Sequence, residues 1–374
     1  MIFYLTFNDA PSGIFSSQVI DVVKFLSTEL KAKTTLIAFI SIRNFFANRK
    51  KIISELPDSL VLPMIPGVGR WKYNLPALKV VCAIKKPSAI IGRSVLATNL
   101  AMETNVPKIV YDGRGAIAAE WSEYNVVNHK KLQEEIFHLE KKAVLNSSYR
   151  IAVSNELVKY WEKEFNYTQR SHSVIPCTLN KVFEELLFTE DSISTYRSRL
   201  SLHQEDIIFV YSGSIAGWQS FNLLYDFVKP VLSRGKKNKL LFLSDKDENI
   251  LKLENEFANQ IICKKVKPSE VPSYLAAADY GLLIREKSVT NKVASPVKFA
   301  EYLACGLKVI ISDELGDYTD FVIKNNCGYR YQEFTEAKTI TLSQKQTIRL
   351  LALRFFTKKT YTAAYQQVIS YKKN

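Results

Sequence analysis

The sequence contains few of the side chains from which metal sites and disulfide frameworks are built. Its 374 residues include only five cysteines and four histidines. The cysteines are odd in number and scattered, no two form a Cys-x-x-Cys pair, and the histidines are not spaced with them as zinc ligands. We therefore expect no structural metal, no disulfide framework and a reducing, cytoplasmic location. The cysteines are Cys82, Cys177, Cys263, Cys305 and Cys327.

Long apolar segments are also missing. No stretch approaches 18 uninterrupted apolar residues, which argues against a transmembrane helix. The first residues, Met1 to Phe7, lack the basic region and the cleavage site of a signal peptide. No internal repeat or low-complexity segment interrupts the chain, and 47% of its residues are hydrophobic. The length and composition predict a folded protein of two domains, each large enough for its own core.

Acidic residues are fewer than basic ones. The sequence contains 37 Asp and Glu and 51 Lys and Arg. The resulting formal net charge of +14 favours anionic partners. The basic residues occur in short clusters, such as Lys141-Lys142 and Lys358-Lys359, without a long basic run or a nucleic-acid-binding motif. Two interpretations stay open, a solvated basic surface and peripheral contact with the inner face of an anionic membrane. We expect no nucleic-acid partner.

Apolar segments of strand length alternate with helical segments throughout both halves of the chain. This alternation predicts an α/β fold with two doubly wound parallel sheets. We place the first domain at residues 1–180, the second at 181–350 and an amphipathic helical tail at 351–374. Strands are expected at residues 2–7, 35–40, 60–65, 89–91, 107–112, 150–155, 173–177, 206–211, 240–244, 280–285 and 307–312, and a turn at 328–330.

The most informative segment runs from residue 295 to residue 306. Ser295 is a good N-cap, Pro296 suits the first helical position, and Gly306 fits just past the helix end. Lys298 and Glu301 are three residues apart and therefore share one face of this helix. A helix N-terminus offers unpaired N–H groups and partial positive charge, to which Lys298 adds a full charge, so a phosphate is favoured there. Glu301, one turn further, is placed to accept hydrogen bonds from two neighbouring hydroxyls.

A simpler interpretation of the same spacing is an exposed ion pair on an ordinary amphipathic helix. Such a pair contributes only about 0.2–0.5 kcal/mol. On spacing alone, this interpretation is favoured because such pairs are common.

Three other segments place polar residues at the ends of predicted strands. The loop 8–13 follows the first strand and ends at Gly13, although its Pro-Ser-Gly sequence also makes a plain turn. Asp112-Gly-Arg114-Gly follows another strand, and its glycines project Arg114 into a cleft or allow an Asp112–Arg114 salt bridge that fixes the turn. The loop Ser212-Gly213-Ser214 follows the first strand of the second domain and can form a nest of N–H groups for phosphate.

The segment Ser295-Pro296-x-Lys298-Phe299-x-Glu301-Tyr302-Leu303-Ala304-Cys305-Gly306, with Val309-Ile310 after it, resembles the donor site of retaining nucleotide-sugar glycosyltransferases. It is most similar to the family 4 enzymes of the GT-B fold that build bacterial capsule, exopolysaccharide and O-antigen. The resemblance implies two facing Rossmann-like domains and a C-terminal helix that crosses back onto the first. It implies that Glu301 holds the ribose hydroxyls of the donor and that Lys298 faces its diphosphate.

The resemblance extends to the loop segments and also shows departures. It implies that the loop ending at Gly13 and the loop 212–214 contribute to the donor site, and that Asp112-x-Arg114-Gly belongs to the acceptor-side domain. The family's Lys-Gly after the phosphate loop is replaced here by Trp218-Gln-Ser220, so Arg285 is our candidate for the missing charge, the alternative being a surface pair with Glu286 or Asp279. A second glutamate expected near the donor sugar is absent from 291–295. No histidine lies near Asp112, so Asp112 or Arg114 is expected to take over that position.

These observations together predict a retaining, metal-independent hexosyl- or related transferase that needs no cofactor. Its partners would be a nucleotide-diphosphate sugar and a glycan or lipid-linked acceptor in cell-surface polysaccharide synthesis. The predicted catalytic residues are Arg285, Lys298, Asp112 and Arg114, and the predicted donor-binding residues are Gly13, Ser212, Gly213, Ser214, Ser295, Pro296, Val297 and Glu301. Two alternatives are a GT-B nucleotide-sugar epimerase or hydrolase and a non-catalytic partner subunit.

Overall fold

The computed structural model describes residues 1–126, 129–213 and 220–371, which form two compact units. Unit 1 contains Met1–Thr178, Val293–Ser295 and Lys358–Asn374, and unit 2 contains Leu179–Lys292 and Pro296–Thr357. The sequence placed the two domain changes at 180 and 350, whereas the chain changes unit after Thr178 and again after Thr357. The second change is later because helix α17 (Leu342–Phe355) packs against α15 (Val297–Ala304) of unit 2.

Unit 1 is built on a parallel sheet of seven strands in the order β3-β2-β1-β4-β5-β6-β7. Because all the strands are parallel, their carboxyl ends lie at one edge, and the strand order reverses between β1 and β4, where ligands of such sheets usually bind. The interior strand β1 is buried along its whole length, which explains its continuous apolar sequence. The strands are β1 (Ile2–Phe7), β2 (Thr34–Ser41), β3 (Leu60–Met64), β4 (Ala89–Arg93), β5 (Ile109–Gly113), β6 (Tyr149–Ala152) and β7 (His172–Val174).

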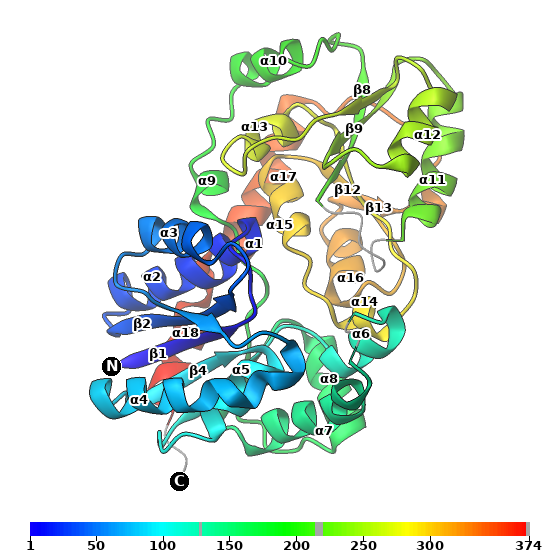
Figure 1. Ribbon diagram of the computed structural model, residues 1–374. Coiled ribbons are helices and arrows are strands. Elements are labelled where there is room, and N and C mark those ends of the chain that lie inside the picture. The colour runs from blue at the N-terminus through cyan, green and yellow to red at the C-terminus, as the bar shows by residue number, and fades with distance from the viewer. Residues whose placement is uncertain (127–128, 214–219, 372–374) are drawn as a thin grey trace. The chain divides into compact units, whose positions relative to one another are not determined.

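Helices cover both faces of this sheet (Figure 1). The C-terminal helix α18 (Thr362–Ser370) belongs to unit 1 and packs on β6 and β7. Its Tyr365 contacts Phe25, with ring centroids 5.5 Å apart. The predicted return of the C-terminal helix to the first domain is thus confirmed. The other helices are α1 (Gly13–Phe15), α2 (Asp21–Thr28), α3 (Phe45–Glu55), α4 (Leu75–Lys85), α5 (Ser94–Met102), α6 (Ile117–Tyr124), α7 (Lys130–Asn146) and α8 (Asn155–Phe165), with a π-helical turn at Ser16–Ile20 and 3₁₀ turns at Val68–Asn74 and Lys358–Tyr361.

Unit 2 repeats this architecture with a parallel sheet of six strands in the order β10-β9-β8-β11-β12-β13. Its strand order reverses between β8 and β11. The strands are β8 (Ile207–Ser212), β9 (Asn238–Leu243), β10 (Ile261–Cys263), β11 (Tyr280–Leu283), β12 (Lys308–Ile311) and β13 (Gly328–Arg330), and the further helices are α9 (Lys181–Glu184), α10 (Glu190–Ser198), α11 (Phe221–Ser233), α12 (Glu248–Glu256), α13 (Val271–Ala276), α14 (Val289–Val293) and α16 (Gly316–Lys324), with a 3₁₀ turn at Tyr331–Glu333.

The predicted α/β architecture of two doubly wound parallel sheets is therefore confirmed. The edge strand β10 was not predicted, and the turn expected at 328–330 is wrong. Residues 328–330 form the edge strand β13, which pairs with β12 through Ile310 and Tyr329. Three residues at a sheet edge carry too little periodic pattern to distinguish a strand from a turn. Among the described residues, no helix is both long enough and apolar enough to cross a membrane.

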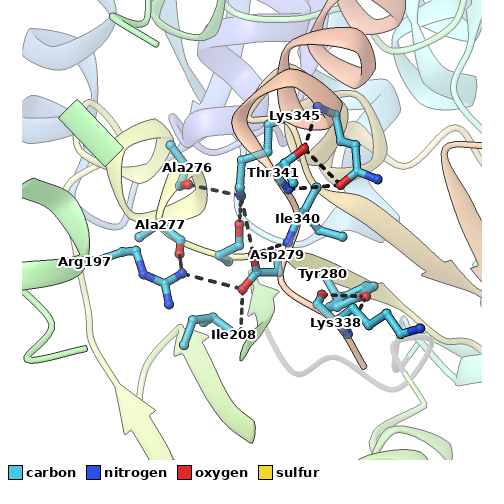
Figure 2. Close-up of polar contacts among 12 residues, drawn as sticks. Arg197, Ile208, Ala276, Ala277, Asp279, Tyr280, Lys338, Ile340, Thr341 and Lys345 are labelled. Atoms are coloured by element: carbon cyan, nitrogen blue, oxygen red, sulfur yellow. Dashed lines mark hydrogen bonds and ion pairs between the residues drawn. The ribbon is translucent and has the colours of Figure 1, made fainter. Parts of the chain in front are cut away.

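Asp279 joins several elements at the amino-terminal edge of the unit 2 sheet (Figure 2). It directly precedes β11, is 1% exposed, and accepts hydrogen bonds from the backbone N–H groups of Ile208 (2.9 Å) and Ile340 (3.2 Å). Two cations flank it, with Arg197 Nη1 at 3.6 Å and Lys345 Nζ at 3.9 Å. Asp279 therefore ties α10, β8 and the start of α17 to β11, the strand that leads to Arg285.

Candidate functional site

Two cationic side chains converge at the carboxyl edge of the unit 2 sheet, beside the reversal of strand order. Arg285 follows β11, and Lys298 lies in the first turn of α15. Burial and the nearby charge of Arg285 hold the pKa of Lys298 well below its usual value, while Glu301 acts in the opposite direction. Lys298 Nζ also lies 4.3 Å from the ring centroid of Tyr211 on β8. Two cationic side chains beside the switch point of a parallel sheet are suited to a phosphate group.

Arg285 is positioned by the strand that carries it. Arg285 is 8% exposed, and its Nη1 donates to Asn291 Oδ1 at 3.3 Å. Its backbone N–H donates to the hydroxyl of Ser312, beyond β12, at 2.7 Å. Asp279, considered above as a surface partner of Arg285, lies at the opposite end of β11 and is engaged by Arg197 and Lys345.

Glu301 lies one turn after Lys298 and is half-buried. Burial raises its pKa to about 7, although the charge of Lys298 acts to lower it. Among the described residues, no donor contacts its carboxylate, so both oxygens can accept hydrogen bonds from a ligand. The exposed ion pair that spacing alone would favour does not fit this environment, because neither side chain is exposed.

The backbone at the end of β8 completes this site. Ser212 donates its N–H to the hydroxyl of Tyr302 on α15 at 3.0 Å, which fixes the helix against the strand. Gly213 has φ +120°, and a Cβ placed there would lie 3.4 Å from Lys298 Nζ. Glycine therefore allows the loop to approach the lysine closely. Ser214, predicted to bind the donor, lies outside the described residues, as do Gly217 and Trp218.

The start of α15 differs by one residue from the sequence prediction. Pro296 is the N-cap residue and Val297 the first helical residue, so the amide N–H groups of the first turn belong to residues 297–299. Ser295 does not cap the helix, since its hydroxyl accepts from the backbone N–H of Cys177 at 2.8 Å. At the other end Gly306 has φ +74°, and Gly306 and Leu307 donate to the carbonyls of Leu303 and Tyr302, so the predicted left-handed closure is confirmed.

Asp112 and Arg114 form a buried ion pair in unit 1. Arg114 Nη2 lies 2.8 Å from Asp112 Oδ2, which also accepts a hydrogen bond from the hydroxyl of Tyr4 on β1. Asp112 has no exposed surface. The alternative of a salt bridge that fixes the turn after β5 therefore describes this geometry better than projection into a cleft. A catalytic role for either residue stays a prediction.

Gly13 begins α1, and its exposed position has room for a side chain, since no atom lies within 4 Å of a Cβ placed there. Ser12 caps this helix by accepting from the N–H of Phe15 at 3.2 Å. The helix continues through the π-helical turn into α2, so an exposed helix N-terminus follows β1. Donor binding by Gly13 stays a prediction.

A pocket of about 610 Å³ opens at the carboxyl edge of the unit 1 sheet, where the strand order reverses. Its polar lining includes Asp9 after β1 and Arg93 at the end of β4, which are paired at 3.3 Å. Glu120, whose pKa is raised by burial and by Glu123, and His129 also line it.

The sequence did not indicate Arg93 or His129 as site residues, and it indicated Asp9 only as part of the loop 8–13. His129 directly precedes α7 and follows no strand, so no strand end in the sequence indicates its place in this pocket. A usable signal was present, because Asp9 and Arg93 are charged residues at the ends of apolar strands.

Comparisons with solved structures identify the fold. No protein-family profile matches the chain, and no curated protein matches it in sequence. Among solved structures, sucrose-phosphate synthase from Thermosynechococcus elongatus has a TM-score of 0.68 at 14% identity, covering 99% of this chain and 98% of that one. HepE of Anabaena in complex with UDP has a TM-score of 0.66 at 12% identity, covering 99% of this chain and 100% of that one. WaaG, a glycosyltransferase involved in lipopolysaccharide biosynthesis, has a TM-score of 0.62 at 11% identity, covering 98% of this chain and 94% of that one. The chain has the GT-B fold.

Replacing Gly213 with alanine tests the close approach of this loop to Lys298. We expect a loss of about 1–3 kcal/mol of folding free energy, because φ +120° is a strained conformation for alanine, and weaker nucleotide binding. Gly235→Ala is the matched control, since no atom lies within 4 Å of its added Cβ. Chemical denaturation and titration with UDP-glucose measure both effects. An alanine tolerated equally at both positions would contradict the proposed constraint.

Proposed function

We propose that this protein is a glycosyltransferase that moves a sugar from a nucleotide-diphosphate donor to an acceptor with retention of configuration. The observation that carries the proposal is the pairing of Arg285 and Lys298 at the switch point of the unit 2 sheet. The N–H groups of the first turn of α15 lie at the same place. Glu301 is the acceptor for the ribose hydroxyls, and Gly213 brings the backbone close to the diphosphate. The UDP complexes of the similar HepE structures support the choice of ligand class.

The chemical demand of such a transfer is the negative charge that develops on the leaving diphosphate. Arg285 and Lys298 supply positive charge from side chains that are in position before the donor binds, so little reorganisation is needed during the reaction. We propose that these charges make a divalent metal unnecessary. Transfer that continues unchanged in the presence of a chelator is the expected result.

The acceptor is proposed to bind at the unit 1 pocket, where Asp9, Arg93, Glu120 and His129 provide polar contacts. A glycan or lipid-linked acceptor of cell-surface polysaccharide synthesis is the class that the sequence resemblance favours. WaaG, of similar structure, is named for a role in lipopolysaccharide biosynthesis.

Activity is tested by nucleotide release from UDP-, GDP-, dTDP- and CMP-sugars, with and without an extract of bacterial lipids and polysaccharides. We expect release from one nucleotide class that depends on the extract, and a product whose anomeric configuration by NMR matches that of the donor. Binding without release would support a non-catalytic subunit. Conversion of the donor sugar without an acceptor would support an epimerase.

The affinity for UDP-glucose is expected to fall below about pH 7. The ionised carboxylate of Glu301 accepts two hydrogen bonds from a diol, whereas the protonated group does not, and its pKa is about 7. The diphosphate of UDP-glucose does not titrate near this pH, so the change reports on the protein. Isothermal titration between pH 5.5 and 8 measures it, and the Glu301→Gln variant should bind more weakly with a flatter profile.

The same substitution has a predictable effect on stability. Because the folded-state pKa of Glu301 lies above its usual 4.5, folding is penalised by this group at high pH. The Glu301→Gln variant should therefore unfold at a higher temperature than the wild type above pH 7, and the difference should vanish as the pH falls toward 4.5. A variant that is less stable than the wild type at pH 8 would contradict the assignment.

A further inference from the structure

The positive charge of the chain is concentrated in one part of unit 1. Residues 30–102 contain twelve Lys and Arg but only two acidic residues, Glu55 and Asp58. A fifth of the sequence thus carries ten of the fourteen net charges. The short basic clusters do not reveal this excess of positive charge, because it results mainly from a lack of acidic residues. The most extended acid-free stretch, residues 59–102, contains α4 and the 3₁₀ turn before it.

Helix α4 presents an apolar stripe to solvent. Ala77, Val80 and Ile84 follow the spacing i, i+3, i+7, which places them along one side of α4, and Tyr73 precedes them in the 3₁₀ turn. Tyr73 is 66% exposed, Val80 58% and Ile84 71%. The residue that α4 buries fully is Leu78. The outer face of a surface helix is ordinarily polar, so an outward stripe of this kind indicates a surface that is covered in the cell.

Lysines border this stripe. Lys79 lies within α4, Lys85 and Lys86 lie at its end, and Lys72 precedes it, and all four are exposed. Glu103, at the end of α5, is close enough for Lys72 and Lys79 to lower its pKa, but its main partner is Lys142, 2.7 Å away. The stripe is therefore an apolar strip within a positively charged rim. The whole of it lies in unit 1 (Figure 1).

We propose that α4 is a membrane-docking helix that rests in the headgroup region of a bilayer containing anionic lipid. Its eleven residues are too few to span a bilayer, so it would lie in the interface plane. Tyr73, Val80 and Ile84 would contact the acyl boundary while the lysines pair with anionic headgroups. A nucleic acid would use the lysines alone, because a duplex backbone offers nothing to an exposed Val and Ile. The docking helix does not depend on the transferase activity and would bring unit 1 to a surface where lipid-linked acceptors reside.

Sedimentation of the full chain with phosphatidylcholine vesicles, with and without phosphatidylglycerol, tests this proposal. We expect binding to the anionic vesicles only. The Lys79→Glu/Lys85→Glu variant should lower vesicle affinity about 25-fold or more, at about fivefold for each lost cation. Val80→Gln/Ile84→Gln should lower it about tenfold or more, because the burial of two aliphatic side chains is lost.

Two matched variants control for charge and for exposed apolar surface elsewhere. Lys236→Glu/Lys237→Glu changes net charge equally at exposed positions of unit 2, and Leu251→Gln/Leu350→Gln removes two exposed leucines of that unit. Both should bind vesicles like the wild type, and all four variants should keep its melting temperature within a few degrees. Absence of binding to anionic vesicles, or equal losses in the control variants, would overturn the proposal. Competition by random duplex DNA together with unchanged vesicle binding of Val80→Gln/Ile84→Gln would indicate a nucleic-acid surface instead.

Discussion

Replacing Lys298 with methionine is expected to weaken UDP-glucose binding about 100-fold and to raise the melting temperature of the free protein. The first effect follows from loss of a partly buried charge that faces the diphosphate, since removing one partner of such a pair costs about 2–5 kcal/mol. The second follows because burial and Arg285 already disfavour the charged form of Lys298, as its lowered pKa shows. A neutral side chain of similar length relieves this cost. Relief of about 1 kcal/mol corresponds to about 2–4 °C in a domain of this size.

Lys308 provides a matched control in the same unit. Its Nζ also lies over a tyrosine ring, 5.0 Å from the centroid of Tyr329, but at the amino end of β12. Lys308→Met should therefore leave UDP-glucose binding unchanged in isothermal titration. Equal binding losses in the two variants would show that the effect is electrostatic over the whole unit. A Lys298→Met variant that binds normally would remove this lysine from the donor site.

Replacing Asp279 with alanine is expected to lower the free energy of unfolding by about 3–5 kcal/mol, or the melting temperature by roughly 10 °C. The substitution leaves Arg197 and Lys345 as buried cations without their counter-charge. It also removes the acceptor for the N–H groups of Ile208 and Ile340. Unpaired buried donors and charges are among the few causes of losses this large.

Asp245 provides the control for this substitution. It pairs with Lys265 at 2.6 Å, but both side chains are about three-quarters exposed, so Asp245→Ala should change stability by no more than about 0.5 kcal/mol. Calorimetry and urea unfolding measure both variants. A small loss in Asp279→Ala would mean that the two cations find other partners, and that β11 is not held in place by this carboxylate.

The site on unit 2 was predictable because its chemistry is local in sequence. Lys298 and Glu301 are three residues apart on one helix, and Ser212 and Gly213 end a strongly apolar strand, so helix spacing and strand ends indicate the positions directly. The N-cap of α15 was harder to predict. Ser295 fits an N-cap by its residue type, but its hydroxyl is taken by Cys177, a residue more than a hundred positions earlier. Tertiary hydrogen bonds of this kind leave no local signal.

The features of unit 1 were harder to find for the same reason. The pocket there depends on Asp9, Arg93 and His129, which the strand order of the sheet brings together although they lie far apart in the sequence. Arg114 was assigned from two flanking glycines, which indicate a tight turn but not whether the side chain points inward to Asp112. The apolar stripe of α4 has the spacing of a buried helix face, and only its exposure in the structure shows that it faces solvent.

The most direct test of the account is thermal unfolding of the wild-type protein with a panel of UDP-, GDP-, dTDP- and CMP-sugars. A ligand at a hundred times its dissociation constant adds about 2.7 kcal/mol, which corresponds to a shift of roughly 5–10 °C. We predict a shift of this size with one nucleotide class and none with the Lys298→Met variant. No shift with any member of the panel would contradict a donor site formed by Arg285, Lys298 and Glu301.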